Sequence, residues 1–480
     1  MADRSTQHSG FRCRKTLSCW FALAVLLVVS SFMICLNSTG RPHFVDRNLL
    51  PADKVFSVIE KANNPPRLPI EERAVNVEQP LFDEIEIRQE EKARDKCDPS
   101  NAVLKVYMYD MPPEFHFGLL DWKPDGKSVW PDIRANIPSY PGGLNLQHSI
   151  EYWLTLDLLS SNFPDRVGPC NAIRVYDSRE ADIIFVPFFS SLSYNRYSRV
   201  IPPETIFRDK LLQQKLVRYL ASQKEWKRSG GKDHVIVAHH PNSMLDARSA
   251  LFPCVFILSD FGRYNPKLAN LEKDLIAPYK HLAKTFVNDS AGFDDRPTLL
   301  YFRGAIYRKE GGNIRQELFY LLRNEKDIYF SFGSIQGNGI STASQGMQSS
   351  KFCLNIAGDT PSSNRLFDAI ASHCVPIIIS DEIELPFEDV LDYSEFCVFV
   401  RSSDAIKEGF LMKLIRGIGR EEWTRMWERL KEVDRYIEYQ YPSREDDAVQ
   451  MIWQALARKV PVIRQKVHRS RRFLRFPTGK

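Results

Sequence analysis

Short apolar runs alternate with stretches of helical spacing between residues 101 and 435. Stretches 147–159 and 206–223 place apolar residues three and four positions apart, as on one face of a helix. Strands that alternate with helices form a parallel sheet covered on both faces. Two further helices are expected at 421–436 and 444–459. The pattern predicts two successive α/β arrays, with strands at 104–109, 173–176, 183–187, 234–238, 255–258, 298–302, 328–332, 352–356, 375–379 and 398–400.

A longer apolar run occupies residues 17–36, about the length that a helix needs to cross a bilayer. Four basic residues precede it, so the short tail at 1–16 is expected in the cytosol and the rest of the chain in a lumen. A cleaved signal peptide is the alternative, but the run is long for one and no small-residue cleavage site follows it. We expect an uncleaved signal anchor.

The segment 37–100 has no sustained apolar period and contains a charged run at 84–96. We interpret it as a stem that is partly disordered or helical. Asn37 and Asn288 each begin an Asn-x-Ser/Thr sequence and are candidate glycosylation sites of a lumenal protein. Asn37 abuts the predicted anchor, so Asn288 is the better acceptor.

Composition is that of a globular protein, with 43% hydrophobic and 26% charged residues and a net charge of +5. No nucleic-acid motif is present. Basic residues crowd the C-terminus, where a solvated tail is favoured over a membrane or polymer contact. Of nine cysteines, six lie beyond the anchor, which permits disulfides without fixing their pairs. Cys353 and Cys374 lie in apolar strand patterns and are interpreted as buried thiols.

The clearest chemical signal is a predicted strand, tight loop, helix and strand over residues 350–387. Gly358, Ser362 and Ser363 lie in the loop, whose serines and proline suit a helix start. In a parallel crossover this loop lies at the carboxyl edge of the sheet. There, backbone N–H groups and the helix dipole favour an anion such as a diphosphate.

Two charged residues on the following helix extend this interpretation. Arg365 can add a cation, and Asp368 lies one turn further on the same face, where a carboxylate can accept both hydroxyls of a ribose. The arrangement suits a sugar-nucleotide donor. An ordinary strand-helix-strand unit with solvated charges fits the same spacing, because no glycine-rich fingerprint is present.

This stretch resembles the donor-binding signature of the exostosin-like glycosyltransferases. The resemblance covers residues 102–435, and Asp368 stands where the family commonly has Glu. This variant is most similar to the plant branch named for arabinan arabinosyltransferases. The matching segments upstream are 106–110, 181–187, 258–263, 301–304, Arg308 and Arg315.

The resemblance implies an α/β fold with two Rossmann-like domains facing a cleft, the GT-B type. The acceptor domain would be 101–290 and the nucleotide-sugar domain 296–435, followed by a C-terminal helix and basic tail at 436–480. The last helices are expected to cross back and brace the first domain.

Sugar transfer needs a neutralised leaving diphosphate, a positioned donor and a deprotonated acceptor hydroxyl. Arg303 and Arg308 follow a predicted strand and precede a Gly-Gly turn, so we assign them, with Arg365, to the diphosphate. No Asp-x-Asp motif has a suitable context, and we predict no metal. No cofactor is expected beyond the nucleotide-sugar donor, which the resemblance implies is UDP-linked.

The general base is expected from the first domain, since side chains at strand ends face the cleft. The resemblance implies an inverting displacement, and His240 corresponds to a histidine of family relatives. The aspartate that often follows that histidine is Pro241 here. Trp122, Trp130 and Tyr140 either stack on acceptor sugars or pack a loop. The base candidates are His240, Glu151 and Asp260, with His148 and His239 beside them.

The resemblance therefore implies a Golgi type II membrane glycosyltransferase of cell-wall polysaccharide, with arabinose as a candidate sugar. Its partners would be a nucleotide sugar, a polysaccharide acceptor and the membrane, with a homo-oligomer or a hetero-oligomer with other transferases as further options, and not nucleic acid. One alternative is the same fold with UDP-xylose, UDP-galactose or UDP-glucuronate. Another is an inactive scaffold for a partner transferase, which the retained Arg303, Arg308, Arg365 and Asp368 disfavour.

Overall fold

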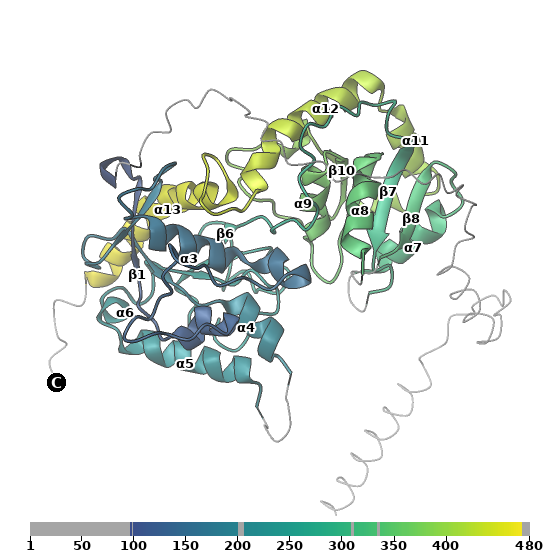
Figure 1. Ribbon diagram of the computed structural model, residues 1–480. Coiled ribbons are helices and arrows are strands. Elements are labelled where there is room, and N and C mark those ends of the chain that lie inside the picture. The colour runs from purple at the N-terminus through teal and green to yellow at the C-terminus, as the bar shows by residue number, and fades with distance from the viewer. Residues whose placement is uncertain (1–96, 98, 200–205, 309–311, 334–336, 473–480) are drawn as a thin grey trace, which may run out of the picture. The chain divides into compact units, whose positions relative to one another are not determined.

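The computed structural model describes residues 97, 99–199, 206–308, 312–333 and 337–472, all within the unit Arg88–Lys480 (Figure 1). The predicted anchor at 17–36, nearly all of the predicted stem and Asn37 lie outside these residues. Within the described ranges, no helix is both long and apolar enough to span a bilayer. These residues form two parallel sheets with helices packed against them, which confirms the predicted α/β class.

The first half of this unit carries a six-stranded parallel sheet with the order β2-β1-β3-β4-β5-β6. β3, β4 and β5 are buried along their whole length, as expected of short apolar strands under helices. The sequence pattern missed β6, which has only two residues. The strands are β1 (Leu104–Met108), β2 (Ala172–Val175), β3 (Ile183–Val186), β4 (His234–Val237), β5 (Val255–Leu258) and β6 (Leu275–Ile276).

The helices of the first half follow the predicted apolar spacing with one difference. The helix expected at 147–159 begins as a 3-10 helix, η4, and continues as an α-helix, α3, after Ser149. His148 therefore ends a tight 3-10 turn instead of lying inside an α-helix. The helices are η4 (Gly143–His148), α3 (Ile150–Ser160), α4 (Ser190–Tyr197), α5 (Arg208–Ser222) and α6 (Lys224–Ser229).

The second half carries a five-stranded parallel sheet with the order β11-β10-β9-β7-β8. Its strands are β7 (Thr298–Gly304), β8 (Ile328–Phe332), β9 (Ser350–Ile356), β10 (Val375–Ile379) and β11 (Val398–Phe399). Helix α9 is strongly amphipathic, with its apolar side chains buried between β9, β10 and α12. The helices are α7 (Asn313–Leu322), α8 (Gly339–Gln348), α9 (Asn364–Ala371), α10 (Ser402–Ala405), α11 (Phe410–Gly417) and α12 (Arg420–Val433).

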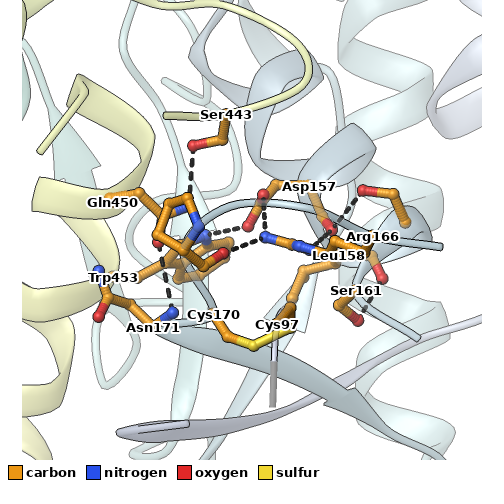
Figure 2. A network of polar contacts seen from close by, with 12 residues as sticks. Cys97, Asp157, Leu158, Ser161, Arg166, Cys170, Asn171, Ser443, Gln450 and Trp453 are labelled. Atoms are coloured by element: carbon orange, nitrogen blue, oxygen red, sulfur yellow. Dashed lines mark hydrogen bonds and ion pairs between the residues drawn. A yellow bond between two sulfur atoms is a disulfide. The ribbon is translucent and has the colours of Figure 1, made fainter. Parts of the chain in front are cut away.

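The last helix, α13 (Ala448–Arg471), follows the second half in sequence but packs on β1, α3 and α6 of the first. Trp453 donates to the buried carboxylate of Asp157 at 2.9 Å, and Arg166 forms an ion pair with the same carboxylate at 2.8 Å (Figure 2). Gln450 extends this network to Ser443. Helix α13 thus crosses back to the first half as the family resemblance implies, whereas α12 packs on α9 and β10 of the second half.

Four residues of the C-terminal basic run, Arg464, Lys466, Arg469 and Arg471, belong to α13, and the first three of them are exposed there. The helix continues beyond Pro461 because Ile463 and Val467 are buried at helical spacing. Arg464 forms an ion pair with Asp182 of the first half.

Among the described residues, two disulfides are present, Cys97–Cys170 and Cys353–Cys374. The interpretation of Cys353 and Cys374 as thiols is therefore wrong. β9 and β10 are hydrogen-bonded neighbours, which brings the two Cα atoms to 5.7 Å, within the range that a disulfide requires. Cys254 and Cys397 are buried and free.

Candidate active site

A cavity of about 420 Å³ opens where the carboxyl ends of strands from both sheets meet. The second half contributes residues that follow β7 and β9 and the start of α9, while the first half contributes η4 and the residues after β4 and β5. The predicted residues that line it are His148, His240, Arg303, Arg308, Gly358, Ser362, Ser363, Arg365 and Asp368. Glu151 and Asp260 do not line it.

The cavity wall carries an excess of positive charge. Five arginines line it against two aspartates, Asp359 and Asp368. Arg308 forms an ion pair with Asp359 at 3.0 Å. Arg303 donates to the carbonyl of Gly339 at 3.4 Å. Because buried cations are costly without counter-charge, a cavity with this surplus favours an anionic ligand.

Arg315 lies deepest in this cluster and is 1% exposed. Its guanidinium donates to three backbone carbonyls, those of Ala305, Ile356 and Ala357, at 3.1, 2.7 and 3.0 Å. Burial and the nearby guanidinium groups of Arg365 and Arg308 lower its pKa to about 9. Backbone carbonyls thus fix its position, and its charge is left for a ligand.

Arg365 is held in the same way at the start of α9. Its Nε donates to the carbonyl of Arg303 at 3.0 Å, and Nη1 donates to Ser363 Oγ at 3.2 Å. Burial, together with the charge of Arg308, lowers its pKa to about 10. A Cβ on Gly304 would lie 2.2 Å from this guanidinium, so only glycine lets Arg365 cross the end of β7.

The loop before α9 adds polar groups that also suit an anion. The backbone N–H of Arg365 donates to the Oγ of the N-cap residue Ser363, and the positive end of the helix dipole lies at this cavity wall. A Cβ on Gly358 would lie 2.8 Å from Arg315, so glycine lets the loop lie over that guanidinium.

Asp368 faces the cavity, yet its oxygens have partners within the protein. Oδ1 accepts from the backbone N–H groups of Leu282 and Ala283 at 2.6 and 2.9 Å, and Oδ2 accepts from Asn364 at 2.8 Å. Burial raises its pKa, while these hydrogen bonds favour the ionised form. In this structure the carboxylate joins α9 to the segment after β6, and its predicted contact with ribose stays a prediction.

Asp260 also connects the two halves. Its Oδ2 accepts from Ser362 Oγ at 2.5 Å, and Ser362 also bonds the hydroxyl of Tyr279 at 2.9 Å. Oδ1 accepts from the N–H of Gly262. Because the carboxylate is buried in these contacts, the geometry favours a positioning role for the donor loop over proton abstraction.

Glu151 is fully buried on α3 and accepts from the backbone N–H of Ser191 at 2.9 Å. Burial raises its pKa to about 8, so the carboxyl is protonated at neutral pH. Ser191 Oγ in turn accepts from the backbone N–H of His240. Glu151 therefore supports the loop that carries His240 and has no contact with the cavity.

Three histidines meet at the first-half side of the cavity. His148 and His240 line it, and His239 lies behind His148 with their Nδ1 atoms 2.8 Å apart. Burial lowers the pKa of His239 to about 3 and of His240 to about 4, and places that of His148 well below its ordinary value. All three rings are neutral at neutral pH.

The aromatic residues proposed for the acceptor pack a loop in this structure. Trp130 stacks on His116 with ring centroids 4.3 Å apart and donates to Asp110. Tyr140 packs on Tyr152. None of Trp122, Trp130 and Tyr140 lines the cavity.

Sequence reasoning did not assign the cavity residues Arg263, Tyr279 and Arg315 to the donor site. Arg263 and Arg315 lie in or beside the stretches that carry the family resemblance, which was the available signal. Within the described part of the chain, no group of three or more His, Cys, Asp or Glu residues could hold a metal ion. Metal independence itself stays a prediction.

Comparison with known families finds that the exostosin GT47 domain matches residues 100–416. The chain is 38% identical over 379 residues to the Arabidopsis thaliana protein named "Probable arabinosyltransferase ARAD1", covering 78% of this chain and 83% of that protein. It is 27% identical to "Probable glucuronoxylan glucuronosyltransferase IRX7" of Arabidopsis thaliana, covering 77% of this chain and 79% of the relative.

Among solved structures, the GtfA/B complex matches with a TM-score of 0.30 and 11% identity, over 55% of this chain and 63% of that one. Anabaena Alr3699/HepE, solved with UDP and glucose, matches with a TM-score of 0.30 and 10% identity. That match covers 75% of this chain and 100% of the other.

Proposed function

The chain belongs to the exostosin GT47 family, and we propose from this premise that it transfers a sugar from a UDP-linked donor to a cell-wall polysaccharide. It is a glycosyltransferase. Arabinose is the favoured sugar, because the arabinosyltransferase relative is 38% identical whereas the glucuronosyltransferase relative is 27% identical.

The observation that carries this proposal is the charge of the cavity in the described part of the chain, where Arg303, Arg308, Arg315 and Arg365 face two aspartates. A nucleoside diphosphate brings the negative charge that this wall lacks. Arg315 and Arg365, held by backbone carbonyls, would bind the diphosphate without reorganising as the glycosidic bond breaks. The start of α9 adds its dipole to the same site.

The reaction we propose is an inverting displacement that needs no metal ion. The first half would hold the acceptor and take its proton, and the arginines of the second half would stabilise charge on the leaving UDP. Cations fixed in place can do for the diphosphate what a divalent ion does elsewhere.

In the test, full-length protein purified in detergent is incubated with an arabinan oligosaccharide and one of four donors. The donors are UDP-arabinose, UDP-xylose, UDP-galactose and UDP-glucuronate. We expect UDP release with UDP-arabinose that depends on the acceptor and is lost in Arg365→Ala. Arg420→Ala is the matched control, because Arg420 is exposed and ion-paired with Asp294 outside the cavity. UDP release from another donor would identify that donor's sugar as the one transferred. Release from none, with UDP still bound, would favour the scaffold alternative.

We also propose a Golgi membrane location with the described body in the lumen. The apolar run at 17–36 with its basic flank supports this, as does Asn288, which is exposed and has a positive φ in a surface turn. Protease added to sealed microsomes should spare the body. Glycosidase should increase the electrophoretic mobility of the wild-type protein. Asn288→Gln should carry one glycan fewer than the wild type. Digestion of the body by the protease would contradict this topology.

A further inference from the structure

The three cavity histidines differ in what their ring nitrogens can do. His239 and His240 directly follow β4, and His148 ends η4, so the carboxyl edge of the first sheet collects all three. The rings of His148 and His240 lie 4.6 Å apart between centroids. Because all three are neutral, each carries one proton, and the hydrogen bonds decide which nitrogen holds it.

The hydrogen bonds of His239 fix the tautomer of His148. His239 Nε2 lies 3.1 Å from the carbonyl oxygen of Ala277, which only accepts, so Nε2 carries the proton and Nδ1 is a lone pair. The contact of 2.8 Å between this Nδ1 and Nδ1 of His148 then requires the proton on His148. Nε2 of His148 is therefore an unprotonated lone pair, and none of the described residues bonds it.

His240 has the opposite arrangement. Its Nδ1 accepts from the backbone N–H of Asn242 at 3.1 Å, so its Nε2 carries the proton. His240, one of the base candidates from sequence, can thus donate to a ligand, whereas His148 can accept a proton. Glu151 and Asp260 do not line the cavity, so among the described first-half residues that do, His148 is the one with a free basic atom.

We propose that His148 is the general base and that His239 is the positioning residue that holds its tautomer; this rests on the proposed glycosyltransferase function. Nε2 of His148 takes the proton of the acceptor hydroxyl as that oxygen bonds the anomeric carbon. The bond from this carbon to the diphosphate breaks, and its electron pair leaves on UDP. The resulting imidazolium donates through Nδ1 to the lone pair of His239, and the anionic nucleotide in the same cavity balances its charge.

The experiment compares full-length wild type with His148→Ala and His148→Gln for acceptor-dependent UDP release and for UDP binding by calorimetry. We expect turnover to fall by about 10²- to 10⁴-fold, the usual contribution of a general base, with UDP affinity unchanged. Added imidazole should restore part of the turnover of His148→Ala, because it can enter the space and accept the proton. His116→Gln is the matched control: His116 is a buried histidine of the same half that does not line the cavity.

His239 gives a second, independent variant. His239→Leu removes the acceptor for Nδ1–H of His148 and should lower kcat with UDP affinity retained, whereas His239→Gln, whose amide oxygen can accept, should restore part of it. Wild-type turnover in folded His148→Gln would overturn the proposal. So would His148→Ala that binds UDP but gains nothing from imidazole. If the wild type releases UDP from no donor, the proposed glycosyltransferase function is wrong. Wild-type activity therefore separates failure of the proposed function from failure of the assignment of His148.

Discussion

The first half and the second half each form one wall of the cavity, and in both walls backbone carbonyls orient the side chains that face the ligand. In the second half, backbone carbonyls hold Arg315 and Arg365 in place without neutralising them, so full positive charge faces the ligand. In the first half, the carbonyl of Ala277 fixes the proton positions of His239 and thereby of His148, and leaves both rings uncharged. A carbonyl is a strong acceptor with no net charge, so it can orient a group without altering its charge. One wall is thereby prepared to stabilise an anion and the other to receive a proton.

Among the residues of the arginine-lined wall, the largest effect on turnover should come from Arg365. Arg365→Ala removes an oriented cation from the diphosphate, and loss of one such donor typically costs about 10²- to 10³-fold in turnover. Acceptor-dependent UDP release measures this, and Arg420→Ala should behave as wild type. Full activity in Arg365→Ala would mean that this wall does not act on the leaving group, and the comparison between the walls would fail.

Arg308 should matter less, because Asp359 already balances its charge and its side chain is partly exposed. Arg308→Ala is expected to lower turnover roughly tenfold, and Arg308→Lys less, since lysine keeps the charge without the planar fork. A chelator should change neither rate. A loss as large as that of Arg365→Ala would show that the ion pair opens when the donor binds. Loss of wild-type activity with chelator would indicate a metal-assisted reaction.

Asp368 tests whether one carboxylate serves both ligand and fold. Asp368→Asn weakens hydrogen bonds to the N–H groups of Leu282 and Ala283 and should cost about 1–3 kcal/mol of stability. If it also binds ribose, UDP affinity should fall roughly tenfold. Urea unfolding and UDP calorimetry separate these effects, with the exposed Asp294→Asn as control. Unchanged UDP affinity would restrict Asp368 to joining the two halves.

The smallest effect on turnover should come from Glu151, whose role is in stability. Its carboxyl is protonated in the folded protein up to a pKa of about 8 but ionises near 4.5 when unfolded. The unfolded state then binds fewer protons between these pH values, so this contribution is complete below pH 4.5 and is lost as pH rises towards 8.

Glu151→Gln keeps an acceptor for the N–H of Ser191 but does not titrate. Between pH 5 and 8 the wild type should lose about 2–4 kcal/mol of stability relative to this variant. Urea unfolding at both pH values measures the difference, and the exposed Glu422→Gln should follow the wild type. Parallel pH dependence in wild type and Glu151→Gln would show that the carboxyl is ionised in the fold.

The sequence predicted what local pattern determines. The ten strands expected from apolar runs all occur, and so does the loop that starts α9, because strand length, turn residues and helical spacing lie within short segments. The arginines assigned to the diphosphate, Arg303, Arg308 and Arg365, reach the cavity because the carboxyl ends of parallel strands lie at one edge of a sheet. The burial of Asp368 and the tautomer of His148 could not be predicted from local pattern, because their partners lie far along the chain. Asp368 accepts from Leu282, 86 positions away, and His148 bonds His239, 91 positions away.

The packing of α13 on the first half also affects the order in which the two halves can fold. Trp453 reaches its partner Asp157 across 296 positions of sequence, and the face of the first sheet that α13 covers is buried only once that helix is in place. During synthesis the second half can therefore close around its own strands while the first half, although made earlier, still exposes apolar surface. We therefore expect the first half, although it leaves the ribosome first, to finish burying this face only after α13 has been made.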